Sequence, residues 1–444
     1  MLPLGSHDCR RFLASPVATC DDGHLARVRG GSAFAVTFVM RLLPVLALAV
    51  AACTATAHDD DDDDAGSATP QDPVVDDEAD FDPAQLAAVR ALITTDDADE
   101  DQVPDVIEEL LLRRYRPLYR WSLADGNDEQ FTPADAIAEL GHAQLRTYDL
   151  DGDGISAPIA NCDPASSLYT CGQDTNLATT FAPRNYCLDL DDARAHGTGI
   201  ADAQAHATGL YGHVVSTLLD GHSAYKIEYW QFFAYNNQDI NYLGIDTWGD
   251  HEGDWTSVQL WFDRERNRLA KIQYLIHGYA VSFAIPERPA GCRSCTVQLQ
   301  GSHYTPAVPN LFDDPHAYDD NQAEMYVDDH GYKHVAVYIE RGGHEDWPGP
   351  WGVAIAGFGP VHLPVNPHNG AGAAYVVPEP DRVLDVGEVD HPRGDAARKM
   401  LTFDGLWGCT NTKDLYVVQR RSSPGPALHC AWEWPDGRQI AGCE

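Results

Sequence analysis

Short segments rich in Val, Ile, Tyr, Phe and Trp dominate the chain from Ala224 onward, each bounded by Gly, Pro, Asn or Asp. The segments are 226–234, 255–262, 271–285, 334–340 and 415–419. Within 255–262, Val258 and Leu260 alternate with Ser257 and Gln259. The composition predicts strands, and the alternation is typical of an antiparallel sheet with one packed face. We therefore expect a mainly β fold: an antiparallel β-sandwich with N-terminal helical decoration and disulfide cross-links.

Two stretches before these strands have helical patterns. In 103–121, Ile107, Leu110, Leu111 and Tyr115 recur at a spacing of three to four residues, which predicts a helix. A second helix is expected over 133–140, continuing through Leu145. We accordingly divide this part of the chain into a helical region with a calcium-type loop, 104–222, and a β-sandwich domain continuous with it, 223–444.

The N-terminal residues predict export and anchoring. Met40 and Arg41 precede an apolar run, 42–52, that is too short to span a bilayer and is typical of a signal peptide. The segment 50–53, Val-Ala-Ala-Cys, is similar to a bacterial lipobox, so we expect 40–52 to be removed and Cys53 to be lipidated. Residues 1–39 are not expected in the product. The predicted location is the cell envelope, at the outer membrane or cell surface; a plain secretory signal with an incidental Cys53 is the alternative.

Negative charge follows this cysteine. The chain has a formal net charge of −38, residues 59–64 are all aspartate, and Arg90 is the one basic residue between Asp59 and Asp101. Such a segment repels itself and buries little surface, so 53–103 is predicted to be a lipidated cysteine followed by an acidic disordered stalk. Because the acidic chain repels phosphates, nucleic acid is not expected as a partner.

Eight cysteines remain in the exported part when Cys53 is set aside. Their even number predicts four disulfides. We expect one bridge among Cys409, Cys430 and Cys443. Cys292 and Cys295 are expected to form a structural bridge, in preference to a redox pair or half of a zinc site. The other three are Cys162, Cys171 and Cys187.

A calcium-type loop is predicted from alternating carboxylates, a glycine and a backbone carbonyl, at Asp149, Asp151, Asp153, Gly154 and Ile155. This is the front half of a calcium-binding loop, in which the carboxylates converge on one ion. Ala160 stands where such a loop has its bidentate glutamate, so Asp163 would have to replace it. A plain Asp-Gly turn is the alternative.

The densest group of charges lies in Gly249-Asp250-His251-Glu252-Gly253-Asp254-Trp255, at the start of the predicted strand 255–262. Three acids and an imidazole in so short a stretch cannot be buried without a partner, and a hard cation is the simplest one. His251 and Asp254 are the predicted ligands, with Asp250 or Asp239 completing the shell of a magnesium, calcium, manganese or zinc ion. The alternative is a solvated acidic turn.

This motif and its surroundings resemble the vacuolar protein sorting-associated protein 62 family. The aromatic run 229–237 and the motif after it are similar to that family's "YW-F-YN" and "GDHxGDW" segments. Weaker similarities follow in the family's order at 115–118, 129–133, 341–344, 405–408, 423–426 and Trp432. The resemblance covers about residues 110–434. It implies a trafficking link by name and no defined biochemical activity.

A more distant similarity is to the secreted necrosis-inducing toxins, whose central motif is "GHRHDWE". In that family the first His, the Asp and the Glu belong to a divalent-cation site that engages host membrane sphingolipid. Aligned on Asp-Trp, His251 and Asp254 match this pattern, whereas Thr256 occupies the Glu position. The resemblance therefore implies two of the three toxin ligands here.

His277 and His344 extend the predicted site. His277 lies in the predicted strand 271–285, and His344 lies in a Gly-rich turn after 334–340. With His251 and Asp254 they would form a set suited to zinc or manganese and able to activate water. Each histidine alone is more typical of a hydrogen-bonded structural residue. The segment 344–347 is also similar to 251–255, which we attribute to coincidence.

The leading functional prediction is a surface-anchored lipoprotein whose cation-dependent β-sandwich recognises an extracellular glycan or lipid head group. Trp248, Tyr242 and Trp347 are predicted to offer aromatic contact surfaces. The alternatives are a metal-dependent hydrolase with His277 or His344 as acid or base, and a scaffold with purely structural ions. Serine hydrolases, zincins and nucleotide-dependent enzymes have motifs that this sequence lacks. No oligomeric state is predicted.

Overall fold

The computed structural model describes residues 80–81, 97–120, 133–148, 155–158, 164, 186–190, 209–236, 241–242, 245–246, 251–276, 279–289, 291–299, 303–306, 323–340, 343–349, 354–358, 361–365, 375–376, 382–403, 405–409, 423–429 and 432. The chain divides into two units, Met1–Gln71 and Asp72–Glu444, and every described residue belongs to the second. The predictions for 1–39, 40–52 and Cys53 therefore lie outside the described residues. Among the residues that are described, no helix is long and apolar enough to cross a membrane.

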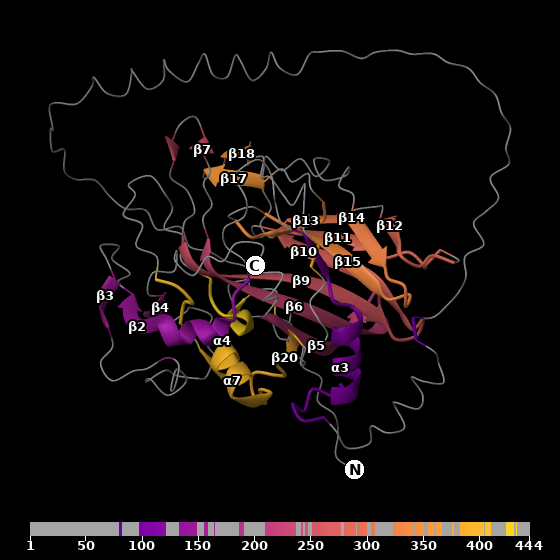
Figure 1. Cartoon of the computed structure of the whole chain (residues 1–444), viewed down its shortest axis with the longest axis horizontal. Coiled ribbons are helices and arrows are strands. Elements are labelled where there is room, and N and C mark those ends of the chain that lie inside the picture. The colour runs from indigo at the N-terminus through magenta and orange to yellow at the C-terminus, as the bar shows by residue number, and fades with distance from the viewer. Residues whose placement is uncertain are drawn as a thin grey trace, which may run out of the picture. The chain divides into compact units, whose positions relative to one another are not determined.

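The largest sheet has seven strands in the order β13-β11-β10-β9-β6-β5-β20 (Figure 1). Their bounds are β5 Leu210–Leu219, β6 His222–Asn236, β9 His251–Asp263, β10 Arg268–Ile276, β11 Tyr279–Ala284, β13 His303–Pro306 and β20 Val383–Asp385. Neighbours are antiparallel, except that β20 runs parallel to β5. Asp220 and Gly221 join β5 to β6 with φ values of 52° and 83°, as in the type I′ turn of a two-residue hairpin.

A second sheet has six strands in mixed directions. Its order is β12-β14-β15-β1-β19, and β16 also pairs with β15. The bounds are β1 Leu118–Arg120, β12 Cys295–Leu299, β14 Ala323–Val327, β15 Lys333–Ile339, β16 Asp346–Trp347 and β19 Tyr375–Val376. β1 runs parallel to β15, whereas the other pairs are antiparallel.

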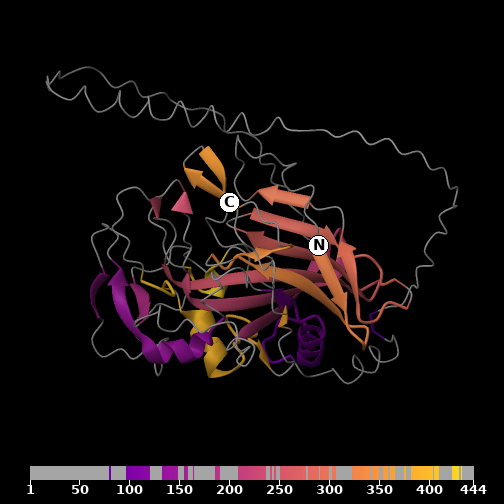
Figure 2. The ribbon, with the colours of Figure 1, turned by 45° about the horizontal axis from the view of Figure 1, so that its top comes forward.

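The two sheets share one hydrophobic core. Val258 and Leu260 of the larger sheet belong to the same buried cluster as Met325 and Val337 of the smaller one. The Tyr274 hydroxyl also donates to the Ala336 carbonyl across this interface, at 2.8 Å. Figure 2 shows orange strands of the second sheet beside the pink strands of the first. The predicted mainly β class is therefore correct, with antiparallel and mixed sheets.

The opposite face of the larger sheet is covered as well. Trp230 and Phe232 belong to a second buried cluster with Met400 of helix α7, Gly394–Thr402. Ser257 and Gln259, expected on an open face, are 2% and 1% exposed. The expectation of a single packed face is wrong for β9, because C-terminal residues pack against its other side.

The remaining elements form smaller groups. A three-stranded sheet, β3-β2-β4, contains β2 Ala143–Tyr148, β3 Ile155–Pro158 and β4 Tyr186–Leu190. Two strand pairs are β7 Asn241–Tyr242 with β8 Ile245–Asp246, and β17 Ala354–Phe358 with β18 Val361–Val365. The helices of the described residues besides α7 are α3 Asp105–Arg114 and α4 Ala136–Glu139, with 3-10 turns η1 Leu140–His142 and η6 Pro426–Leu428.

The described residues of 104–222, which the sequence predicts to be helical, form strands as well as helices. Helix α3 ends at Arg114, since a residue before proline, here Arg116 before Pro117, is disfavoured in helical conformation. Helix α4 stops at Glu139, and β2 begins at Ala143, where the second helix was expected to continue. Strands β1 to β5 all lie in this range.

The strand predictions are closer to the structure. Segments 226–234 and 255–262 fall within β6 and β9, and 334–340 matches β15. Segment 271–285 is instead a hairpin, because β10 and β11 pair from Lys271 with Ala284 to Ile276 with Tyr279. Segment 415–419 lies outside the described residues.

Two parts of the predicted stalk pack on the folded unit. Phe81 is 3% exposed and lies in the core with its ring 5.6 Å from that of Phe262. Asp80 forms an ion pair with Lys333 at 2.7 Å and accepts a hydrogen bond from the Leu269 N–H at 2.7 Å. Residues 97–103 are also ordered on this unit. A disordered stalk over 53–103 is therefore wrong for 80–81 and 97–103, because these acids have specific partners.

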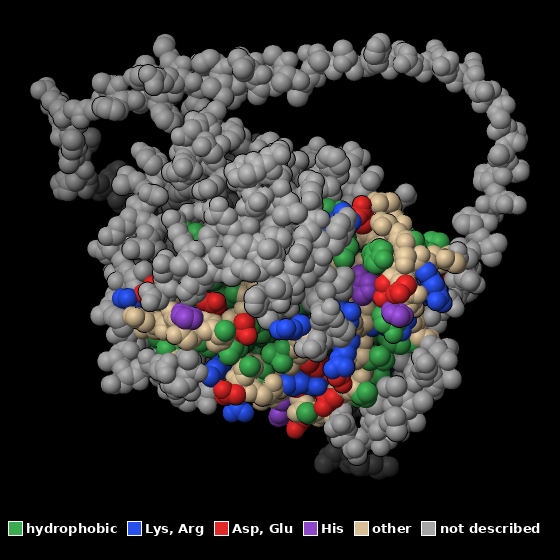
Figure 3. All heavy atoms as spheres, in the orientation of Figure 1, with side chains coloured by type: hydrophobic (Ala, Val, Ile, Leu, Met, Phe, Trp, Pro, Cys, Tyr) green, Lys and Arg blue, Asp and Glu red, His purple; other side chains and the backbone are tan. Residues whose placement is uncertain are grey.

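Charged side chains on the described part of the surface do not form a single acidic patch. In the view of Figure 3, blue Lys and Arg side chains lie among red Asp and Glu side chains. Exposed pairs such as Arg113 with Glu109, at 2.5 Å, contribute to this pattern. The charged side chains of described residues in this view therefore do not gather in one acidic patch.

Two cysteine pairs lie at disulfide distance. Cys292 pairs with Cys295, as predicted, and Cys187 pairs with Cys409 across a sequence separation of 222. Because β4 brings Cys187 beside Cys409, the bridge expected among Cys409, Cys430 and Cys443 could only join the last two, which lie outside the described residues. Of the eight cysteines predicted to form disulfides, Cys162, Cys171, Cys430 and Cys443 lie outside the described residues.

Candidate metal centre around Asp254

The Asp254 carboxylate, near the start of β9, is surrounded by three side chains. His251 Nε2 lies 3.5 Å from Asp254 Oδ1. Asn236 of β6 donates from Nδ2 to Asp254 Oδ2 at 2.9 Å. His344 Nδ1 lies 3.9 Å from the same Oδ2. Pairing of β6 with β9 sets this arrangement, because His251 and Asn236 are register partners.

His344 comes from the segment between β15 and β16. Its φ is 61°, and its N–H donates to the Glu340 carbonyl at 2.9 Å. The buried ring stacks on Phe233, with centroids 4.0 Å apart and planes 4° from parallel. Asn236 Nδ2 also donates to the Gly343 carbonyl at 3.0 Å. One amide thus joins this segment to Asp254.

Asp346 is a further buried acid, and the charge of Asp254 acts on it. It lies in β16 opposite Ile339 of β15, and it is 0% exposed. Neither of its carboxylate oxygens has a hydrogen-bond partner among the described residues. An unpaired buried carboxylate is costly, so Asp346 requires a positive partner or a proton. We call His251, Asp254, His344 and Asp346 the Asp254 cluster.

The two carboxyls of the Asp254 cluster are shifted in opposite directions. Burial acts to raise the pKa of Asp254, but the hydrogen bond and charge of His251, with the charge of His344, hold it below its usual value. Burial raises the pKa of Asp346 well above its usual value, and the charges of Glu345 and Asp254 raise it further. The cluster therefore combines an ionised carboxylate with one that lacks a counter-charge.

His429 is a further histidine near Asp254, and sequence reasoning did not select it. Burial lowers its pKa, although the charges of Glu345 and Asp254 act in the opposite direction. Its ring is 5.3 Å from that of Trp230 at an angle of 76°. No motif surrounds position 429, so only the fold brings this imidazole to the site.

The structure brings His251, Asp254 and His344 together from two segments distant in sequence. The predicted site residues outside the described part of the chain are Asp239, Trp248, Asp250, His277, Asp149, Asp151 and Asp153. For Tyr242 in β7 and Ile155 at the start of β3, the backbone alone is described. Tyr148 and Ile155, which flank the predicted calcium-type loop, are register partners of β2 and β3.

Trp347 does not offer a surface to a ligand. It is 1% exposed and belongs to the core shared by the two sheets. Its Nε1 donates to Glu340 Oε2 at 3.4 Å. The predicted contact role is wrong, because β16 packs against β9 and β10 of the larger sheet and this ring lies in the shared core.

The two similar segments 251–255 and 344–347 are neighbours in space. β16 packs against β9, and the charge of Asp254 acts on Asp346. Trp255 and Trp347 are both buried. The sequence similarity that we attributed to coincidence therefore has a spatial counterpart, in which each segment contributes one His and one Asp to the Asp254 cluster.

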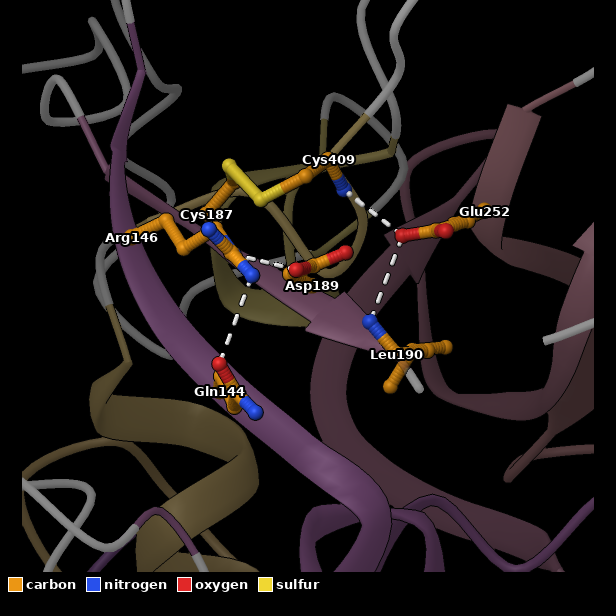
Figure 4. Close-up of a disulfide and its surroundings, with 7 residues drawn as sticks. All are labelled: Gln144, Arg146, Cys187, Asp189, Leu190, Glu252 and Cys409. Atoms are coloured by element: carbon orange, nitrogen blue, oxygen red, sulfur yellow. Dashed lines mark hydrogen bonds and ion pairs between the residues drawn. A yellow bond between two sulfur atoms is a disulfide. The ribbon is translucent and has the colours of Figure 1, made fainter. Parts of the chain in front are cut away.

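Glu252, between the two ligands predicted on β9, has a structural role. Its Oε2 accepts hydrogen bonds from the Leu190 and Cys409 N–H groups, both at 3.2 Å (Figure 4). Burial raises the pKa of Glu252 to about 7; Asp189 adds to the rise, and the two N–H donors oppose it. One acid of the central motif thus joins β9 to β4 and to the Cys187–Cys409 bridge.

Sequence reasoning missed a group of acids at the start of α3. One oxygen from each of Asp99, Asp101 and Glu108 lies within 4.8 Å of the others, and the same holds for Asp97, Asp99 and Asp105. Among the described residues, the Asp254 cluster does not reach this degree of convergence. The regular spacing of these acids was a usable signal, which the general acidity of the predicted stalk obscured.

His213 of β5 is buried between two glutamates, and this arrangement makes the stability of the fold depend on pH. His213 Nδ1 lies 3.3 Å from Glu228 Oε2, and Nε2 lies 2.7 Å from Glu388 Oε1. The ring stacks on Trp432 with centroids 3.9 Å apart. Burial acts to lower the pKa of His213, but the charges and hydrogen bonds of Glu388 and Glu228 raise it to about 10.

We expect this pair to weaken as the pH rises. Folding raises the pKa of His213 from 6.5 to about 10. The stabilisation from the protonated imidazole is therefore complete below pH 6.5 and is lost as the pH rises toward 10. The melting temperature should therefore fall over this interval, and His213→Gln should reduce the slope. His222→Gln, at an exposed histidine beside Glu265, is the control. Equal slopes for wild type and His213→Gln would contradict the assignment.

No family model, curated protein or solved structure matches this chain. The resemblances to the vacuolar protein sorting-associated protein 62 family and to the necrosis-inducing toxins therefore stay predictions. The geometry of the Asp254 cluster is the basis on which a function can be proposed for this chain.

Proposed function

We propose that this chain is a divalent-cation-dependent binding protein of the cell envelope, which recognises a glycan or lipid head group through a cation at the Asp254 cluster. The observation that carries the proposal is Asp346, a fully buried carboxylate with no hydrogen-bond partner among the described residues. A cation shared with Asp254 and His344 would supply the missing positive charge. Carboxylate oxygens and imidazole nitrogen together suit magnesium, calcium, manganese or zinc.

The side chains of the Asp254 cluster differ in exposure, which supports access of a ligand from the side of His251 and Asp254. The side chains of His251 and Asp254 are 9% and 14% exposed, whereas that of His344 is 0% exposed. No three ligand atoms of the described cluster residues lie within 4.8 Å of one another, so the protein would supply few ligands to a cation there. A cation with few protein ligands retains positions for external oxygens. Phosphate groups and sugar hydroxyls provide such oxygens.

The envelope location is supported by the sequence of residues 40–53 alone. A lipid on Cys53 would hold the cluster near membrane lipids and surface glycans, which raises their effective concentration. Outside the cell, calcium at about 1 mM also fills weak oxygen sites.

A metal-dependent hydrolase is the second candidate, and His429 favours it. An imidazole kept neutral by burial beside a cation site can accept a proton from cation-bound water. Burial lowers the pKa of His429, and the charge of Asp254 acts on it. His344 suits a ligand better than an acid or base, because it is enclosed and stacked on Phe233. A scaffold with purely structural ions would show neither binding nor turnover.

Replacing Asp254 with Asn is expected to remove one equivalent of bound divalent metal, and His251→Ala to do the same. Because both residues act on one cation, the double variant should lose no further metal. Elemental analysis of dialysed protein measures the stoichiometry, with circular dichroism to verify the fold. Asp263→Asn, the same change at the other end of β9, is the control. Its carboxylate accepts from the Glu265 and Arg266 N–H groups, so its metal content should be unchanged.

The recognition step is tested with vesicles containing anionic phospholipid and with immobilised glycans. Wild-type protein should bind one of these surfaces with metal present, and chelation or Asp254→Asn should abolish that binding. Binding that survives both treatments would contradict the proposal. Metal-dependent release of a cleaved product would assign the site to the hydrolase alternative.

A further inference from the structure

Residues 97–108 have the spacing of a complete calcium-binding loop. Counted from Asp97, acids occupy the first, third, fifth, ninth and twelfth positions, namely Asp97, Asp99, Asp101, Asp105 and Glu108. In an EF-hand loop these positions carry oxygen ligands, and the twelfth is a bidentate glutamate. The predicted loop at Asp149 lacks that glutamate, whereas this one has it on helix α3.

The backbone of this loop compensates for its one departure from the pattern. The sixth position is normally glycine, which permits a sharp turn, and here it is Gln102. Gln102 has a φ of 73°, and Glu100 has a φ of 62°. The chain thus adopts at Gln102 the left-handed conformation that glycine would allow. Val103, at the seventh position, would offer its backbone carbonyl.

Three acids of the loop are buried with an oxygen that lacks a partner. Asp99, Asp101 and Glu108 are 2%, 3% and 0% exposed. One carboxylate oxygen of each has no hydrogen-bond partner among the described residues: Asp99 Oδ1, Asp101 Oδ2 and Glu108 Oε1. One oxygen from each also lies within 4.8 Å of the other two. Three carboxylates that converge this closely repel each other unless positive charge lies between them.

The other oxygens of these carboxylates are already bound, which fixes their orientation. Asp101 Oδ1 accepts from the Val103 N–H at 2.6 Å. Asp99 Oδ2 lies 3.4 Å from Arg393 Nε, and Glu108 Oε2 pairs with the same guanidinium. Arg393 also pairs with Asp105 and Asp385, at 2.7 Å and 2.9 Å. One guanidinium cannot neutralise so many carboxylates, so positive charge is still missing.

We propose that the loop 97–108 binds one calcium ion through Asp99, Asp101 and Glu108, with Asp97 and the Val103 carbonyl completing an all-oxygen shell. Calcium is the preferred ion because it takes six to eight oxygen ligands in flexible geometry. The loop contains no histidine or cysteine, which disfavours zinc.

The ion would tie the N-terminal acidic segment to the folded unit. Helix α3 packs against β5 and β20 (Figure 1). Arg393, just before α7, contacts the loop from the other side. Calcium would thus fix the start of α3 against the sheet, independently of the Asp254 cluster.

The test is calcium binding by the full chain, measured by isothermal titration and by equilibrium dialysis with calcium alone as the probe. Glu108→Gln and Asp99→Asn each keep side-chain size and should each lose one equivalent relative to wild type. Glu109→Gln is the matched control. The Glu109 carboxylate is 53% exposed and pairs with Arg113, so this variant should keep the wild-type stoichiometry.

Hydrogen exchange gives an independent readout. Calcium should slow exchange at amides 98–108 in wild type and in Glu109→Gln but not in Asp99→Asn. If Glu108→Gln does not fold, the same measurements are made on Asp101→Asn, because Asp101 lies before helix α3. Unchanged calcium stoichiometry in the folded variants would overturn the proposal and leave Arg393 with bound protons as the counter-charge.

Discussion

Replacing Gly253 with alanine is expected to destabilise the protein by about 3–5 kcal/mol, from a strained backbone together with an overlap in a packed region. Gly253 has a φ of 60°. A Cβ at this position would overlap the Trp407 carbonyl, and a Cβ at Gly408 would overlap the Glu252 carbonyl. The two backbones therefore touch where neither tolerates a side chain. Chemical denaturation followed by tryptophan fluorescence measures the loss.

Gly221→Ala separates the two contributions. Gly221 has a φ of 83°, but a Cβ added there would meet nothing within 4 Å, so alanine adds only backbone strain of about 1–2 kcal/mol. Similar losses for both variants would show that the approach of Gly253 to Trp407 does not limit stability. The metal content of Gly253→Ala also reports whether this approach positions Asp254.

Removing the Cys187–Cys409 bridge with a double alanine variant is expected to cost about 2–5 kcal/mol. The bridge spans a sequence separation of 222 and joins β4 to the segment that carries Trp407. Trp407 packs on Trp255, with ring centroids 5.2 Å apart. Because a cross-link over a long loop restricts the unfolded chain strongly, urea unfolding without reductant should show a lower midpoint.

The Cys292–Cys295 bridge provides the matched comparison. It closes a sequence separation of 3, so the corresponding double alanine variant should lose much less stability, since the constraint grows with loop length. Equal losses for the two double variants would contradict this loop-length explanation. Unchanged stability without Cys187 and Cys409 would show that Glu252 and the tryptophan contacts hold the segment unaided.

Local sequence patterns predicted the central strands but did not predict which strands pair with them. Short runs rich in β-branched and aromatic residues, bounded by turn residues, located β6, β9 and β15. The parallel pairs of β1 with β15 and β20 with β5 join distant segments, and no local pattern encodes such pairing. The β10–β11 hairpin was missed although Gly278 supplied a turn signal within 271–285.

Some residues of the candidate site could likewise be predicted from local sequence, whereas others are brought together only by the fold. His251 and Asp254 were recognisable because charge at a strand start needs a partner. Asn236, Asp346 and His429 were not, since their proximity depends on β16 crossing to β9 and on the C-terminal turn. The loop 97–108 was recognisable from spacing, but the acidic residues before it suggested disorder throughout.

An anomalous difference map from crystals grown with manganese tests the central claim most directly. The account predicts a peak within coordinating distance of Asp254 and His344, about 2.0–2.6 Å from the ligand atoms, with at least one position open to solvent. The peak should be absent in Asp254→Asn crystals and present in Asp263→Asn crystals. A map with no peak at the Asp254 cluster, from crystals in which the loop 97–108 is occupied, would contradict a cation-dependent function for this site.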